Sequence, residues 1–143
     1  LDQGKNPVLP SAGALSQSRA PHESTKLTRQ EMLDRSGALA TVLDGAISAG
    51  LIEAKKIFSS DDLAVLNSVV EASRFGLEPR HLRGMRLAVD REVGLVSQAV
   101  SATTSSRKAL PPEELREKGR ELCDILMTLR QAITKDALNR LES

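Results

Sequence analysis

Apolar side chains recur every three or four residues through most of the chain beyond residue 27, which is the spacing of one face of an α-helix. Breaks in this pattern fall at Gly37, Gly50, Gly76 and the Ser/Thr-rich segment 101–106. We therefore predict a mainly α fold. Residues 1–27 are rich in Pro, Gly and Ser without any period, and we predict that they form a flexible linker.

Capping signals mark the starts of the predicted helices. Thr28 and Glu31 have the spacing of a capping box, in which each side chain accepts a hydrogen bond from the backbone of the other residue. A second helix is expected to end just before Gly50, since glycine readily adopts the left-handed backbone that follows a helix. Ser59 or Ser60 is expected to cap a third helix.

Two short apolar pairs lie between the second and third predicted helices. Leu51-Ile52 and Ile57-Phe58 flank two lysines, and only five residues separate Ile52 from Phe58. So short a connection favours a tight turn or a small two-stranded hairpin. Two helices, a short β wing and a third helix are the layout of a winged helix-turn-helix, which we expect over residues 28–100.

A fourth helix is predicted from Pro79 to about Val100, followed by a linker over residues 101–110. A long helix is then predicted over 111–143, opened by a Pro-Pro-Glu-Glu sequence. Its apolar positions alternate spacings of four and three, which is the seam of a coiled coil. Such a seam can pair with a second copy or fold back on its own chain. The candidate dimerisation residues are Leu115, Leu122, Leu126, Leu129, Ile133 and Leu141.

Composition narrows the classes of function. Apolar residues make up 40% of the chain and the formal net charge is +1, so no global charge attracts nucleic acid or an acidic membrane. Two Phe are the only aromatic residues, which argues against stacking of single-stranded nucleic acid. No apolar run approaches the roughly 18 residues of a membrane span, and no signal pattern opens the chain. We expect a cytoplasmic protein without a membrane partner.

Residues that could support catalysis or bind metal are few. Cys123, His22 and His81 are the only sulfhydryl and imidazole groups, and they do not have the spacing of a metal site. Cys123 is expected to pack in a helix contact. No nucleophile, base and orienting group can be assembled from the motifs present, so we predict neither an enzyme nor a cofactor.

The order of landmarks resembles bacterial MerR-family transcription regulators. Gly50-Leu51-Ile52, the segment Phe58–Leu63 and Gly76-Leu77 follow one another as they do in the DNA-binding unit of that family. The resemblance covers about residues 28–100. It implies a winged helix followed by a long helix for antiparallel dimerisation, and therefore a homodimer.

The departures from the MerR pattern concern the surface that meets DNA. Where the family has Leu-Arg-Tyr-Tyr-Glu, this chain reads Leu43-Asp44-Gly45-Ala46-Ile47, and no Lys or Arg stands between Ser36 and Ala54. The wing, which is Arg-rich in the family, is short. Residues 28–100 hold nine Lys/Arg and ten Asp/Glu, whereas DNA-binding modules present a basic surface. We infer a degenerate MerR-like scaffold that has lost direct contact with DNA.

Two further segments are similar to the C-terminal part of actinobacterial MerR-type regulators of the FtsR kind, which are linked to control of cell-division genes. These segments are Arg74 to Arg83 and Asp90 to Leu95. That resemblance implies a C-terminal effector and dimerisation region. Since the chain begins at Leu1 and not at Met, we expect an upstream DNA reader that is missing here. DNA would be bound through that domain, and an unknown effector or protein partner would act on this one.

Two alternatives stay open from the sequence. A basic cluster at the fourth helix could contact DNA phosphates, so that the chain is a second DNA-contacting winged helix, or it could bind an anionic effector. The cluster could equally be a solvated face, since Arg86 and Asp90 have the spacing of an ordinary helical ion pair. The chain could also be a hetero-protein interaction module that uses its final helix. The residues of the cluster are Arg80, His81, Arg83 and Arg86.

Overall fold

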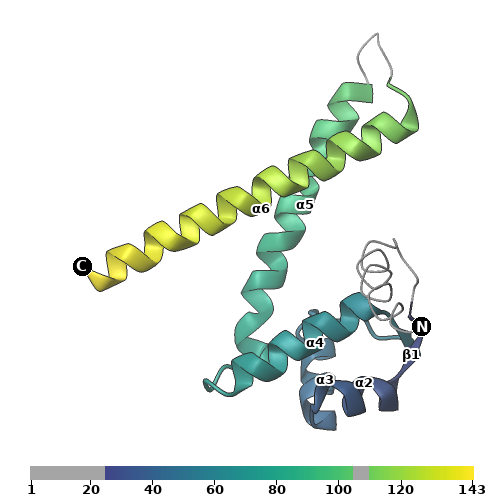
Figure 1. The fold of residues 1–143 in the computed structure, drawn as a ribbon, viewed down its shortest axis with the longest axis vertical. Helices are drawn as coiled ribbons and strands as arrows, with labels where there is room; N and C mark the ends of the chain where they lie inside the picture. Colours follow the sequence, from purple (N-terminus) through teal and green to yellow (C-terminus); the bar gives the residue numbers. More distant parts are fainter. Residues whose placement is uncertain (1–24, 105–109) are drawn as a thin grey trace, which may run out of the picture. The chain divides into compact units, whose positions relative to one another are not determined.

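The computed structural model describes residues 25–104 and 110–143, so most of the predicted linker 1–27 and the middle of the predicted linker 101–110 lie outside the described residues. The chain divides into two compact units, the first ending at Leu82 and the second running from Arg83 to Ser143. Figure 1 shows the elements of both units.

Within the described residues, the first unit has three α-helices, a 3₁₀ turn and a two-stranded antiparallel sheet, and the second has two α-helices (Figure 1). The prediction of a mainly α fold with a small β element is confirmed. The elements of the first unit are β1 (Leu27–Thr28), α2 (Arg29–Ser36), α3 (Ala40–Ser48), β2 (Ile57–Phe58), α4 (Ser60–Ser73) and the 3₁₀ turn η2 (Pro79–Leu82).

Two capping boxes start helices of the first unit. At α2, the Thr28 hydroxyl accepts from the backbone N–H of Glu31 at 3.2 Å, and Glu31 Oε1 accepts from the backbone N–H of Thr28 at 3.1 Å. At α4, Ser59 and Asp62 make the same reciprocal pair at 3.1 and 2.8 Å. These contacts satisfy backbone donors that a helix start leaves without partners. The box at Thr28 was predicted, and of the two serines expected to cap the third helix the structure uses Ser59, with a reciprocal contact from Asp62 that was not predicted.

The pairing predicted for the wing is wrong. Strand β2 pairs with β1, with Leu27 opposite Phe58 and Thr28 opposite Ile57, and not with Leu51-Ile52. The backbone N–H groups of Leu51 and Ile52 both donate to the carbonyl of Ala46, at 2.9 and 3.4 Å. They close the end of α3 and are therefore not available for a strand ladder.

Leu27 belongs to the folded core, although the sequence placed it in the linker. Its side chain is only 1% exposed. The strand pairing sets it beside Phe58, and together they help to close one core shared by the three helices and the sheet. Fully burying one large apolar side chain contributes about 1.5–3 kcal/mol, which favours ordering this short strand. The core cluster consists of Leu27, Met32, Leu43, Ala46, Ile52, Phe58 and Leu66.

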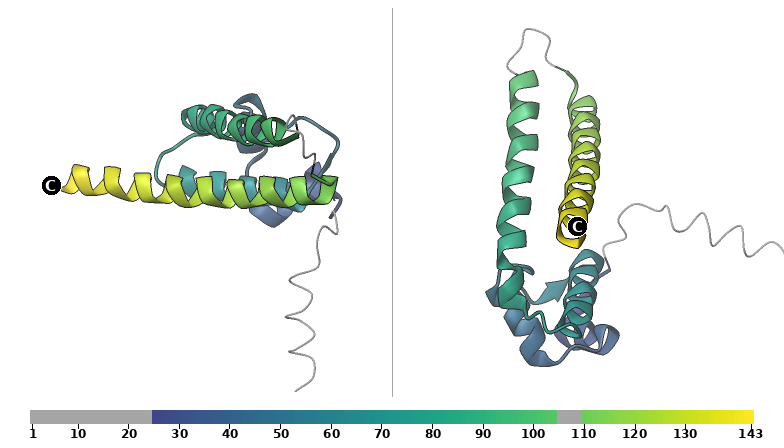
Figure 2. Two further views of the ribbon diagram at one scale, coloured as in Figure 1. Left: turned by 90° about the horizontal axis from the view of Figure 1, so that it is seen from above. Right: turned by 90° about the vertical axis from the view of Figure 1, so that its left-hand side faces the viewer.

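The second unit is a hairpin of two helices, α5 (Arg83–Thr104) and α6 (Pro112–Glu142), which run in roughly opposite directions and cross each other (Figure 1 and Figure 2). The predicted fourth helix differs from the structure at both ends. Its first turn, Pro79–Leu82, is 3₁₀ helix, and its last turn continues to Thr104, so the predicted break begins four residues too early. The long final helix is confirmed within one residue at each end.

The carboxylate of Asp62 is held by two groups at the start of α4. Its side chain is 16% exposed, and Oδ2 accepts from the Ser59 backbone and from Lys55 Nζ, each at 2.8 Å. Partial burial would raise the pKa of Asp62, but the hydrogen bonds from Lys55 and Ser59 outweigh it and lower the pKa below its ordinary value. A lowered folded-state pKa stabilises the fold above the unfolded-state pKa of about 3.9, and the effect is lost as the pH falls through the folded-state value.

We expect Asp62→Asn to lower the free energy of unfolding at pH 7 by about 1 kcal/mol, a typical effect of losing a helix cap. Urea unfolding monitored by circular dichroism at pH 7 and at pH 3 measures it, and the difference from the unmodified chain should shrink at the lower pH. Asp61→Asn is the control, because Asp61 lies in the same helical turn but outside the capping box. Equal losses in the two variants would contradict this role for Asp62.

Candidate functional site

In the winged helix-turn-helix predicted from the sequence, the outer face of α3 is the one that would meet DNA. Asp44 is exposed on this face, and its Oδ1 pairs with Arg29 Nη2 at 2.8 Å. Helix α3 itself contains no Lys or Arg. The nearby guanidinium is thus held by a carboxylate, which leaves this face poorly suited to phosphate contacts.

The basic cluster predicted from the sequence is divided between the two units. In the first unit, Arg80 Nε pairs with Glu78 Oε2 at 2.7 Å, and His81 Nδ1 accepts from the backbone N–H of Glu78 at 2.9 Å. In the second unit, Arg86 Nε pairs with Asp90 Oδ1 at 3.1 Å, and Arg83 begins α5. Two of the three arginines are therefore paired with carboxylates from nearby positions of the chain.

The first half of the predicted coiled-coil seam faces α5 of the same chain. Helices α5 and α6 approach closely at Gly119, where a methyl group added to the glycine would lie 3.7 Å from Val100 Cγ2 and 3.9 Å from Val96 Cγ1. Half-buried seam positions continue on both sides of Gly119, at Leu115, Leu122 and Leu126. In this part of the helix the seam folds back within the chain.

The second half of the seam is exposed. Leu129, Ile133 and Leu141 are 51%, 59% and 83% exposed, and every residue from 131 to 143 is exposed. Figure 1 shows this half of α6 extending away from α5. Three of the six predicted dimerisation residues thus face the other helix within the chain, and three are open to contact.

The hairpin has no core of its own. No residue that the structure describes in α5 or α6 is fully buried. Many large apolar side chains are instead exposed, which is uncommon for a stable monomer and typical of a surface that another molecule covers. These side chains are Met85, Leu87, Val89, Val93, Leu95, Ile125, Met127, Leu129, Ile133, Leu138 and Leu141.

A groove between α5 and α6, which we call the hairpin groove, has a volume of about 350 Å³. The half-buried thiol of Cys123 lies in this groove, in agreement with its expected place in a helix contact. A smaller groove of about 210 Å³ lies nearer the connection between the helices, beside Leu115 and Leu122. The hairpin groove is lined by Val89, Glu92, Val93, Val96, Cys123, Leu126, Met127 and Arg130.

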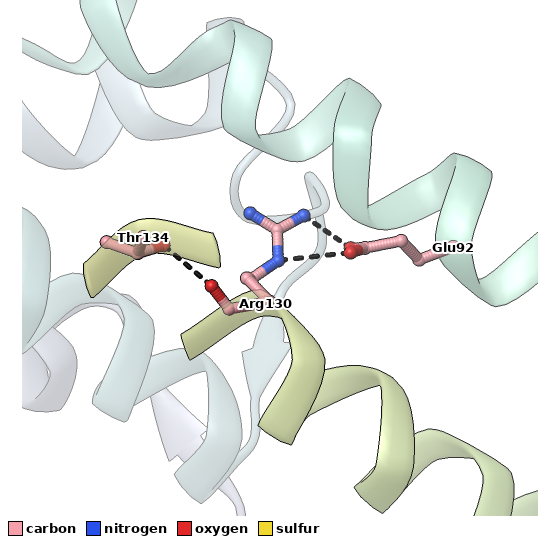
Figure 3. Close-up of polar contacts among 3 residues, drawn as sticks. All are labelled: Glu92, Arg130 and Thr134. Carbon is pink, nitrogen blue, oxygen red and sulfur yellow. Dashed lines mark hydrogen bonds and ion pairs between the residues drawn. The ribbon is translucent and has the colours of Figure 1, made fainter. Parts of the chain in front are cut away.

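An ion pair joins the two helices at the hairpin groove. Arg130 Nε donates to Glu92 Oε1 at 3.2 Å, and Arg130 Nη2 donates to Glu92 Oε2 (Figure 3). Hydrogen bonding to Glu92 raises the pKa of Arg130 further above its ordinary value. Thr134 Oγ1 donates to the Arg130 carbonyl at 2.8 Å, one turn further along α6.

This ion pair was not predicted from the sequence. Glu92 and Arg130 are 38 residues apart, so no local pattern links them. One signal was present, because Arg130 follows Leu126 by four residues and so places a charge on the apolar seam. A charge in that position indicates a partner across the helix contact.

Neither a metal site nor a membrane span is found within residues 25–104 and 110–143. No group of three or more His, Cys, Asp or Glu is placed to hold a metal ion. No helix there is long and apolar enough to cross a membrane.

A family model described as "Rv1828-like, C-terminal domain" matches residues 25–142. The chain belongs to this family. The chain is also similar to two proteins named "Uncharacterized HTH-type transcriptional regulator", Rv1828 of Mycobacterium tuberculosis and Mb1859 of Mycobacterium bovis. Identity is 28% over 115 residues with each, which is 79% of this chain but 47% of the relative. The chain thus spans about half the length of these relatives.

The close approach at Gly119 makes a prediction about the hairpin. Gly119→Ala should raise the free energy of unfolding by up to about 1 kcal/mol, because alanine favours helix over glycine and its methyl group fits at van der Waals distance. Gly119→Leu should instead lower it, since the longer side chain must separate the helices. Thermal unfolding followed by circular dichroism measures both effects.

Gly94 is the control, because a methyl group added there would meet no other atom within 4 Å. Gly94→Leu should therefore be neutral or stabilising. If Gly119→Leu behaves in the same way, the two helices do not meet at Gly119.

Proposed function

We propose that this chain is the C-terminal effector and dimerisation region of a MerR-type DNA-binding transcriptional regulator of the FtsR kind, acting in the cytoplasm. Three findings support the regulatory part of the proposal: the family of Rv1828-like C-terminal domains, the names of the two mycobacterial relatives, and the greater length of those relatives. The landmark sequence around Gly50-Leu51-Ile52 supports the MerR assignment.

Dimerisation is supported by one observation above all, which is the exposed apolar surface of a hairpin that has no buried residue among those described. Covering a large apolar side chain is worth roughly 1.5–3 kcal/mol, and the distal half of α6 offers several of them. A second copy carries the same surface, so a two-fold pairing buries it on both partners at once. Two hairpins packed in this way make a four-helix bundle.

The regulatory mechanism follows from this pairing. Dimeric readers of a palindromic DNA site must be held at the spacing of the two half-sites. In our proposal the α5–α6 hairpins hold two upstream readers at that spacing, and an effector changes it. The first unit is a winged-helix scaffold whose α3 face, with Asp44 paired to Arg29, no longer contacts phosphate.

The double variant Leu129→Asp/Ile133→Asp tests the dimer surface. We expect the molar mass measured by light scattering to fall from dimer to monomer, because four carboxylates would meet in the pairing face. The first unit should stay folded, since none of its core residues is altered. Its folding can be checked by methyl NMR signals of that core.

Thr128→Asp/Gln131→Asp is the matched control, since it adds the same charge to exposed positions on the opposite side of the same helix. The control should remain dimeric. A dimeric mass for both double variants would show that the distal half of α6 is not the contact, and a monomeric mass for the unmodified chain would favour a hetero-protein interaction module.

The loss of DNA contact makes a separate prediction. We expect no binding of this chain to random-sequence duplex DNA up to about 100 µM at about 50 mM salt, where phosphate contacts are most favourable. Fluorescence anisotropy of a labelled duplex measures it. Micromolar binding that weakens as salt rises, and that Arg80→Ala/Arg83→Ala/Arg86→Ala removes, would instead support a second DNA-contacting winged helix.

A further inference from the structure

We propose that the hairpin groove binds a medium-chain carboxylate, with the apolar chain between α5 and α6 and the carboxylate on the guanidinium of Arg130. This inference rests on the proposed function, because it names the chemical class of the effector. It requires only the second unit, in which both helices and the ion pair lie.

The lining and the size of the groove favour a small apolar ligand. Its volume of about 350 Å³ lies in the range of small-molecule pockets, about 300–1,000 Å³. Six of the eight lining side chains are apolar or a thiol, and the two charged ones form a pair with each other. Pockets with an apolar lining and a few polar groups orient ligands that have one polar end.

The ion pair decides the charge of that polar end. Both carboxylate oxygens of Glu92 accept a hydrogen bond from Arg130, through Nε and Nη2. Nη1 of Arg130 points away from Glu92 in Figure 3, and the described part of the chain gives it no acceptor. A guanidinium has five N–H donors, so donors are left over at this site. The Arg130 side chain is 38% exposed, so these donors are accessible to a ligand in the groove, and a carboxylate matches the planar guanidinium well.

The length of the apolar part follows from the positions that line the groove. Arg130, at the polar end of the groove, and Cys123 are separated by seven residues of α6, a rise of roughly 10 Å at about 1.5 Å per residue. An extended chain of roughly eight carbons spans that rise. Octanoate is therefore a suitable probe.

Binding here would act on the dimer surface. Leu126 and Met127 line the groove, and Leu129 lies in the next turn on the exposed half of α6. A ligand held between the helices orders the point where α6 leaves α5. It thereby sets the direction of the half that carries the pairing face.

The first experiment is isothermal titration of the 143-residue chain with octanoate, octan-1-ol and octyltrimethylammonium. We expect octanoate to bind at least about tenfold more tightly than the other two, since a charge-assisted hydrogen bond is stronger than a neutral one. Arg130→Met should remove this preference and leave the affinity for octan-1-ol unchanged. Arg140→Met is the control, because Arg140 is on the same helix and paired with Asp136, but does not line the groove. Equal affinities for the three probes would overturn the proposal.

A second pair of variants tests the place of binding. Val93→Phe fills the hairpin groove and should weaken octanoate binding at least about tenfold, whereas Leu95→Phe should have no effect. Both side chains are 56% exposed on α5, but only Val93 lines the groove. The proposal would be overturned if Val93→Phe bound octanoate as tightly as the unmodified chain. It would also be overturned if Val93→Phe lost the dimer but kept octanoate binding, since that would indicate that a second copy occupies the groove.

The outcome for the ligand can be separated from the outcome for the proposed function by measuring the molar mass with and without saturating octanoate. If the Arg130 and Val93 variants change octanoate binding as expected but the chain is a monomer with and without octanoate, the binding site is supported and the dimer is contradicted. A stable dimer that binds none of the three probes would retain the proposed function and reject the ligand.

Discussion

Two helices cannot enclose an apolar core, and this constraint governs the second unit. Helices α5 and α6 meet closely at Gly119, where a methyl group would fit but a larger side chain would push the helices apart. Away from that point the helices leave an apolar groove and a row of exposed leucine, isoleucine, valine and methionine side chains. The burial that would stabilise such a hairpin must come from a further surface. Assembly and ligand binding are two ways of supplying that surface.

The first unit, in contrast, encloses an apolar core of its own. Three helices and a short sheet close around Met32, Leu43 and Leu66, which are all fully buried. Two capping boxes hold the starts of α2 and α4. Its outer α3 face carries an acidic side chain paired to Arg29, so this face lacks the basic surface that DNA-binding modules present. In our proposal the first unit is a folded scaffold, and the second unit makes the contacts with a second copy and with the effector.

Features set by residues close together in the sequence could be predicted, whereas contacts between residues far apart in the sequence were missed. Capping at Thr28 and Ser59, the helical segments and the left-handed glycine at Gly50 follow from local spacing, and the structure has them. The partner of β2 was wrong, because the backbone of Leu51 and Ile52 was not recognised as closing α3. Periodicity also showed that one face of α6 is apolar without saying what covers it. The Glu92–Arg130 pair had no local signature at all.

The most direct test of the proposed assembly is the molar mass of the unmodified chain. Sedimentation equilibrium between about 1 and 100 µM would measure it without a label or a surface. We expect a dimer of twice 15.4 kDa that persists through most of this range. A monomer at every concentration, with both helices of the hairpin intact by circular dichroism, would contradict the proposal, because the apolar surface of α5 and α6 would then be stable in water.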